Sequence, residues 1–254
     1  MRYFHHAPFL LAILLCGCKP GNDASTGTSM PPEPWASRPH AEWPQLVLTN
    51  VATFKGHTPL QGASGFLVHS ESGETLAATA AHLLGENGGV SPEVTLADLD
   101  SSFDSWIMHP RTMPDRTIKL LGSASKTSAP KNNDWLLLRV DGKTEHATPL
   151  RLRKTPVKVG EKVHLVGVSY SEPEVAQKVY SGVVTARGYG DRFRFDITPH
   201  VAIPGFSGAP ILDDAGLVVG VMTVWFNPRM DGELWTEAGG EDAASAFAIM
   251  KEAK

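Results

Sequence analysis

From residue 45 onward the chain is a succession of short apolar runs separated by turn residues, a pattern that limits the fold to strands joined by tight turns. The 24 glycines and 19 prolines supply many such turns and disfavour long helices. We predict strands over residues 45–54, 65–69, 75–79, 93–96, 117–121, 135–140, 162–168, 178–187, 192–198, 209–212 and 217–225. Residues 244–249 fit a closing strand, with 250–254 as the stub of a short C-terminal helix, and the pattern does not decide this point.

The predicted strands form two groups of similar size, separated by a proline-containing stretch over residues 148–158. Each group has enough strands for a small barrel or sandwich. We therefore predict an all-β fold of two β-barrels packed side by side. The first barrel covers residues 45–150 and the second covers residues 151–254.

The first 17 residues have the features of an export signal. Arg2 precedes an apolar run over residues 7–15, which is too short to span a bilayer as a helix. The string Leu15-Cys16-Gly17-Cys18 resembles a bacterial lipobox, which implies cleavage after Gly17 and a lipid on Cys18. We expect a lipid-anchored protein of the cell envelope, in the outer membrane and facing the periplasm, because Lys19 follows Cys18. A plain secretory signal and a chance apolar start remain alternatives.

Residues 18–44 are predicted to be a proline-rich tether between the lipid and the first barrel. Between Gly21 and Pro44, five prolines lie among small polar residues, a composition that buries too little apolar area to fold. Trp35 and Trp43 are unusual in a linker, and we expect them to dock on the surface of the folded part.

Composition excludes several classes of function. A net charge of −4 gives no basic surface for nucleic acid. The two cysteines, Cys16 and Cys18, both belong to the signal region, so no disulfide framework is expected. The sequence contains neither an HExxH metal motif nor a glycine-rich phosphate loop with the required spacing, and we predict no metal and no cofactor.

Three short segments carry residues suited to catalysis. Thr79-Ala80-Ala81-His82 ends a predicted strand. Asn133-Asp134-Trp135 begins another, and Gly205-Phe206-Ser207-Gly208-Ala209-Pro210 forms a glycine-flanked turn. A serine hydroxyl becomes nucleophilic when an imidazole takes its proton and a carboxylate orients that imidazole. The glycines let the amides of Gly205 and Ser207 converge into an oxyanion hole.

The order of these residues along the chain discriminates between hydrolase folds. No histidine follows Ser207, which excludes the α/β-hydrolase order with this serine. The only aspartate before His82 is Asp23, in the tether, which disfavours the subtilisin order. The order His82, Asp134, Ser207 remains, and it is the chymotrypsin order.

With these motifs the sequence resembles a trypsin-like serine protease of the bacterial, disulfide-free type. The resemblance covers about residues 46–250 and includes Gly220-Val221-Met222-Thr223 as the strand beside the specificity pocket. It implies two Greek-key barrels with the active site in the cleft between them. It also implies a serine endopeptidase that forms an acyl-enzyme on protein or peptide substrates, with Thr223 adding a hydrogen bond near Asp134.

The resemblance also allows a prediction of specificity. Val201 stands where trypsins place an aspartate, and Met222 stands where glutamate-specific relatives place a histidine. Trp225 aligns with a glycine that keeps the trypsin pocket open. These residues predict small or medium apolar side chains before the scissile bond. Phe206 replaces the aspartate that receives a new N-terminus in many relatives, so we expect activity without zymogen cleavage.

Two other functions remain open. The first is a catalytically latent or inactive trypsin-like fold that binds peptides as an envelope lipoprotein, since an exposed strand edge can pair with an extended peptide. The second is a serine hydrolase that acts on an ester or on a single partner protein. Retention of all three residues of the triad favours the protease.

Overall fold

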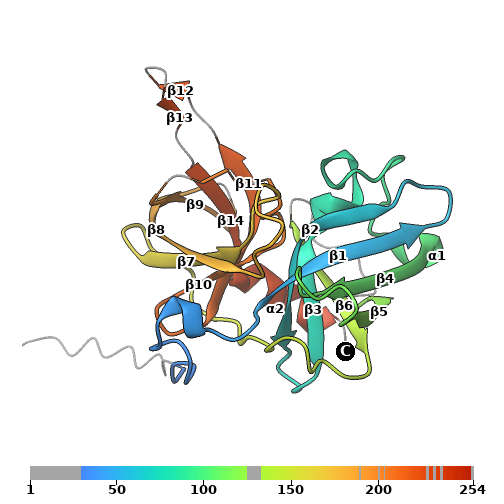
Figure 1. Cartoon of the computed structure of the whole chain (residues 1–254), viewed down its shortest axis with the longest axis horizontal. Helices are drawn as coiled ribbons and strands as arrows, with labels where there is room; N and C mark the ends of the chain where they lie inside the picture. The colour runs from blue at the N-terminus through green and yellow to red at the C-terminus, as the bar shows by residue number, and fades with distance from the viewer. Residues whose placement is uncertain are drawn as a thin grey trace, which may run out of the picture. The chain divides into compact units, whose positions relative to one another are not determined.

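Two closed β-barrels follow one another along the chain in the computed structural model (Figure 1). The structure describes residues 30–124, 133–188, 190–199, 201–202, 204–226, 229–230, 233–234 and 237–252. Cys18 and the predicted signal lie outside these residues. The all-β, chymotrypsin-like fold class is confirmed.

In the first barrel, neighbouring strands pair antiparallel in the order β1-β2-β3-β6-β5-β4. β1 and β4 close the barrel, with Thr49 opposite His109. The strands are β1 (Val47–Phe54), β2 (Leu60–His69), β3 (Thr75–Ala80), β4 (Phe103–His109), β5 (Ile118–Ser123) and β6 (Trp135–Asp141). Between β3 and β4 lie η2 (Ala81–Leu84), η3 (Glu86–Gly88) and the single-turn helix α1 (Leu99–Ser102).

The second barrel repeats this Greek-key order with β7-β8-β9-β14-β11-β10. A separate two-stranded sheet, β12 (Arg229–Met230) with β13 (Glu233–Leu234), lies between β11 and β14 in the sequence. The barrel strands are β7 (Lys162–Gly167), β8 (Lys178–Arg187), β9 (Arg192–Ile197), β10 (Pro210–Leu212), β11 (Val218–Phe226) and β14 (Glu237–Asp242). Helix α2 (Ala243–Glu252) follows β14 directly.

Two parts of the barrels differ from the sequence prediction. Residues 93–96 are not a strand, and β4 (Phe103–His109) occupies the place in the barrel that such a strand would need. The closing strand is β14 (Glu237–Asp242), whereas residues 244–249 belong to α2. The apolar residues Ala243, Ala246 and Ile249 recur at helical spacing and pack into the core, which explains why this segment is a helix.

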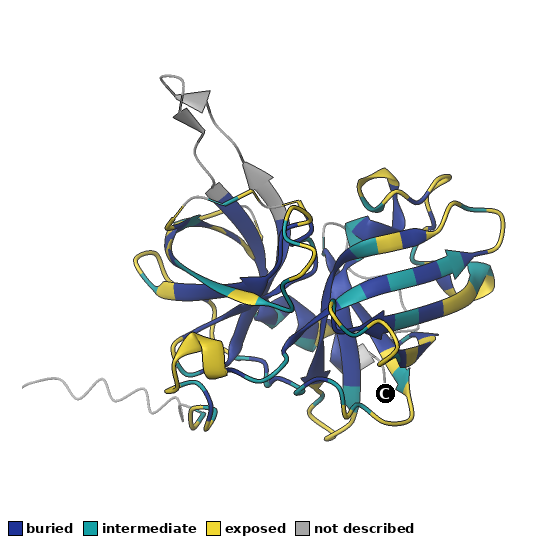
Figure 2. Cartoon of the chain, viewed as in Figure 1, coloured by how far each residue is buried: buried dark blue, intermediate teal, exposed yellow. Residues whose placement is uncertain are grey.

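Each barrel has its own apolar core, and a third core joins them. Trp106 and Leu138 are buried in the first barrel, and Phe193 and Phe195 in the second. Figure 2 shows that the barrel strands are mostly buried while the turns are exposed. The joining core contains residues of both barrels and of α2, including Phe66, Trp135, Leu137, Val166, Val218 and Ile249. Burial of this shared apolar area stabilises the two barrels against each other.

Trp35 and Trp43 dock on the folded part, as expected, and hold residues 31–44 against the protein. Trp35 and Trp43 are each 7% exposed and belong to the joining core, with ring centroids 4.9 Å apart. The segment includes η1 (His40–Glu42). The Glu33 amide donates to the Ala215 carbonyl at 2.8 Å. Two buried indoles supply the apolar area that the surrounding prolines and small polar residues lack.

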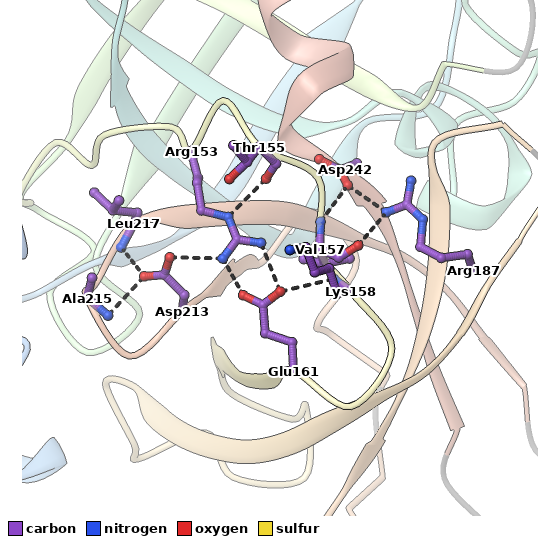
Figure 3. Close-up of polar contacts among 10 residues, drawn as sticks. All are labelled: Arg153, Thr155, Val157, Lys158, Glu161, Arg187, Asp213, Ala215, Leu217 and Asp242. Carbon is purple, nitrogen blue, oxygen red and sulfur yellow. Dashed lines mark hydrogen bonds and ion pairs between the residues drawn. The ribbon is translucent and has the colours of Figure 1, made fainter. Parts of the chain in front are cut away.

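The connection between the barrels is anchored by a buried polar network (Figure 3). The Arg153 guanidinium pairs with Glu161 and, at 3.2 Å, with Asp213. Its Nε donates to the Thr155 carbonyl at 3.0 Å. The Arg153 side chain is 15% exposed, so solvent screens these contacts little.

Replacement of this arginine therefore has a measurable cost. We predict that Arg153→Met lowers the free energy of unfolding by about 2–4 kcal/mol, because it leaves two carboxylates partly buried without their cation. Urea unfolding followed by tryptophan fluorescence measures the change. Lys143→Met, which removes an 83%-exposed cation paired with Glu145, is the control and should change stability by about 0.5 kcal/mol or less. Equal effects of the two substitutions would contradict the account.

Candidate active site

His82 lies in η2, directly after β3, at the edge of the first barrel. The Ala81 amide donates to the Asp134 carbonyl at 2.7 Å, which continues the pairing of β3 with β6 beyond the strand ends. The His82 side chain is 20% exposed. Strand pairing therefore brings two residues together that are 52 positions apart.

The Asp134 carboxylate makes two hydrogen bonds with His82. Oδ2 lies 2.7 Å from the ring nitrogen Nδ1, and Oδ1 accepts the His82 backbone N–H at 2.8 Å. One carboxylate thus fixes both the ring and the backbone of the same residue. With the proton on Nδ1, Nε2 is left as a hydrogen-bond acceptor and a base.

Ser207 lies in a turn whose shape depends on two glycines. Gly205 has φ +106° and Gly208 has φ +82°, a region that side-chain-bearing residues rarely adopt. A Cβ on Gly208 would lie 2.2 Å from the Ser64 carbonyl oxygen and 2.4 Å from Thr79 Oγ1. At Gly208 the turn therefore lies so close to the first barrel that a residue with a side chain would not fit.

The first barrel holds this turn through hydrogen bonds from β2. The Ser64 amide donates to the Ser207 carbonyl at 2.8 Å, and the Ser64 hydroxyl donates to the Gly205 carbonyl at 2.8 Å. Within the described part of the chain, no hydrogen bond has the Gly205 or Ser207 amide as its donor.

Tyr170 makes a second connection between the barrels. Its amide donates to the Pro204 carbonyl at 3.0 Å, and its hydroxyl accepts the Ala63 N–H at 2.6 Å. Ala63 has φ +56°, a strained conformation for a residue with a Cβ. The phenol therefore stabilises an unusual backbone position next to Ser64.

A cleft of about 420 Å³ contains most of the predicted site residues. The predicted residues that line it are His82, Asp134, Gly205, Ser207 and Thr223. Sequence reasoning missed the others, which come from several separate loops and strands without a shared motif. They are Leu60, Ala63, Leu83, Asn87, Gly88, Tyr170, Arg192 and Pro204.

Two expected contacts are not formed. None of the hydrogen bonds among the described residues joins the Ser207 hydroxyl to His82, although both side chains line the cleft. Thr223 is 4% exposed, and its hydroxyl has no hydrogen-bond partner within the described residues. The expected hydrogen bond from Thr223 near Asp134 is therefore not made.

Of the residues predicted for the specificity pocket, Thr223 lines the cleft, whereas Val201 and Met222 do not. Met222 is 2% exposed and belongs to the core of the second barrel, and Val201 packs against the same core. Neither lines the cleft. Trp225 belongs to β11, and its side chain lies outside the described part of the structure. Phe206 is fully buried in this core, with its ring 5.4 Å from that of Tyr180.

Glu241 is a buried carboxyl group in contact with Asp134, and no motif in the sequence marks it. It lies on β14 and is 2% exposed. Its Oε2 accepts the Asp134 backbone N–H at 2.8 Å. Burial, together with the negative charge of Asp134, raises the pKa of Glu241 to about 7.

Two further observations bear on cofactors and membranes. Among the residues that the structure describes, no group of three or more metal-binding side chains is arranged to hold an ion. No helix in the same residues is long and apolar enough to cross a membrane.

Comparison with solved structures finds the same fold in bacterial proteases. The active form of the Rv3671c protease from M. tuberculosis matches with a TM-score of 0.55 at 16% identity, over 88% of each chain. A serine endoprotease from Yersinia pestis matches with a TM-score of 0.52 at 20% identity, over 83% of this chain and 62% of that one. The HtrA-type protease AlgW, solved with a tripeptide, matches with a TM-score of 0.53 at 20% identity, over 82% and 59% of the two chains.

Sequence comparison gives the family. A search of curated proteins finds no match to this chain. The family model described as "Trypsin-like peptidase domain" matches residues 63–221, which include all three predicted catalytic residues. This match spans more than half of the sequence, so the chain belongs to the trypsin-like peptidase domain family and is a serine protease of that family.

Proposed function

We propose that this protein is a serine endopeptidase in which Ser207 is the nucleophile, His82 the general base and acid, and Asp134 the group that orients the imidazole. The observation that carries the proposal is the pair of hydrogen bonds from His82 to Asp134, at 2.7 and 2.8 Å, in the cleft that also contains Ser207. A short carboxylate contact to Nδ1 is what a histidine needs in order to act as a base through Nε2.

The proposed reaction has two halves. The Ser207 hydroxyl attacks the carbonyl carbon of the scissile peptide while His82 Nε2 accepts its proton. The negative charge that forms on the carbonyl oxygen is stabilised by the amides of Gly205 and Ser207. The imidazolium then gives its proton to the leaving amine as the C–N bond breaks. Water attacks the acyl-serine with the same proton transfers and releases the carboxylic acid.

Small or medium apolar side chains are the proposed preference before the scissile bond. Within the described lining of the cleft, Asp134 is the only carboxylate, and it is engaged by His82. A lysine or arginine side chain would therefore find no free negative charge there.

We further propose that the protein is exported and carries a lipid on Cys18. The apolar run and the Leu15-Cys16-Gly17-Cys18 string support this, and Lys19 favours the outer membrane, facing the periplasm. Packing of residues 31–44 on the protein leaves a span of at most about a dozen residues between Cys18 and the folded part.

The alternative is a latent or inactive fold that binds peptides as an envelope lipoprotein. One observation favours it, namely that Ser207 makes no hydrogen bond to His82 among the described residues. Such hydrogen bonds are often loose before substrate binds, so the protease remains the better interpretation.

Covalent labelling with a fluorophosphonate probe tests the proposed triad. We predict that the purified protein is labelled on one serine and that Ser207→Ala abolishes labelling. His82→Ala and Asp134→Asn should slow it by about 10³-fold or more, because the hydroxyl loses its oriented base. Ser72→Ala, which removes an exposed serine in the turn between β2 and β3, is the matched control and should label normally. A folded wild-type protein without labelling would support the alternative.

Cleavage of a randomised peptide library tests the proposed specificity. We predict enrichment of alanine, valine or leucine before the cleaved bond, since no free counter-charge lines the cleft. Mass spectrometry of the products identifies the cleaved bonds, with Ser207→Ala protein as the blank. Predominant cleavage after lysine or arginine would contradict this preference.

Intact mass and cell fractionation test the lipid anchor. We predict that the mature protein begins at Cys18, carries an added acyl mass and sediments with membranes. Cys18→Ala should lose the added mass and leave the membrane fraction, whereas Cys16→Ala should retain both properties because that residue is removed with the signal. An unmodified Cys18 in the mature protein would rule out the anchor.

A further inference from the structure

The backbone amide of Asp134 is bonded to a second acid from the other barrel. Glu241 Oε2 accepts this N–H at 2.8 Å, while the Asp134 side chain holds His82. The first barrel contributes His82 and Asp134, and the second contributes both Ser207 and Glu241. Glu241 is therefore the point at which the second barrel fixes the acid of the proposed triad.

We propose that Glu241 is a positioning residue of the active site: its carboxyl group holds Asp134 in place, and its charge, when ionised, stabilises the imidazolium that His82 forms during the reaction. The proposal rests on the proposed function, because it assumes that His82 activates Ser207. Glu241 is 2% exposed and pairs across the sheet with Arg192 of β9 and Val221 of β11. Figure 1 shows β14 between these two strands.

One positive and one negative charge act on Glu241 in opposite directions. Arg192 lines the cleft and is the cation that favours ionised Glu241, while Asp134 opposes it. The next residue, Asp242, is neutralised by Arg187 at 2.7 Å, and β11 faces Glu241 with the apolar Val221. The titratable or charged groups on the packed elements include His82, Asp134, Arg187, Asp191, Arg192, Arg194, Asp196 and Asp242.

The ionisation of Glu241 falls in the range where the enzyme would work. Burial raises the pKa of its carboxyl to about 7, so the group is largely neutral at pH 6 and largely charged at pH 8. When ionised, Glu241 adds a second negative charge beside the Asp134–His82 pair. Such a charge stabilises the imidazolium that forms in the transition state.

Glu241→Gln separates the two roles. A glutamine carbonyl can still accept the Asp134 N–H, but the side chain carries no charge at any pH. We predict that the rate of fluorophosphonate labelling at pH 8 falls by about threefold to tenfold. In the pH–rate profile, the rates of the two proteins should converge at pH 6, where Glu241 is largely neutral in the wild type. A role in geometry alone would leave the rate of Glu241→Gln equal to that of the wild type at every pH, because glutamine keeps the hydrogen bond to Asp134.

A second variant and a control keep the outcome interpretable. Arg192→Gln removes the cation that favours ionised Glu241. In this variant the rate increase that follows ionisation of Glu241 should occur at a higher pH than in the wild type. Glu161→Gln removes a carboxyl group of the Arg153 network, away from the cleft, and should leave the profile unchanged.

Stability gives a readout independent of activity. The pKa of Glu241 is higher in the folded protein than its ordinary value of 4.5, so its contribution to stability is fully present below about pH 4.5 and is lost as the pH rises through about 7. The urea midpoint of Glu241→Gln should therefore exceed that of the wild type at pH 8 and approach it at pH 5. Identical pH dependence of rate and midpoint in both proteins would overturn the inference. Absence of labelling in folded wild-type protein would instead overturn the proposed function.

Discussion

The site depends on the two hydrogen bonds that the Asp134 carboxylate makes with His82. The carboxylate bonds to the His82 ring at 2.7 Å and to the His82 amide at 2.8 Å, so one charged group fixes the direction of the imidazole. Its own position is fixed twice, by the pairing of β3 with β6 and by Glu241 of the second barrel. A buried charge is tolerated there because its hydrogen bonds offset the cost of desolvation.

The two barrels complete each other at the cleft. The first barrel provides His82 and Asp134, while the turn with Ser207 belongs to the second barrel and is held by Ser64 of the first. The apolar core around Trp135 joins the barrels and keeps these polar contacts in register. The proposed site therefore lies at the interface between the barrels, and neither barrel alone contains all of its residues.

Sequence patterns predicted most of the strands but did not predict β14. Alternating apolar runs identify most strands, but β14 (Glu237–Asp242) has no apolar alternation and is a strand because it pairs with β9 and β11. The motifs around His82 and Ser207 identified the cleft, since tight turns and strand ends leave clear local patterns. Tyr170 and Glu241 left no such pattern, because each acts on the site through contacts that arise only when distant segments pack together.

The most direct measurement is a crystal structure of the protein after reaction with a peptidyl boronic acid that ends in an apolar residue. The account predicts a bond from boron to Ser207 Oγ, a boronate oxygen about 3 Å from the amides of Gly205 and Ser207, and an unchanged contact between His82 and Asp134. An unreacted Ser207 in well-ordered protein, or a boronate oxygen directed away from both amides, would contradict it.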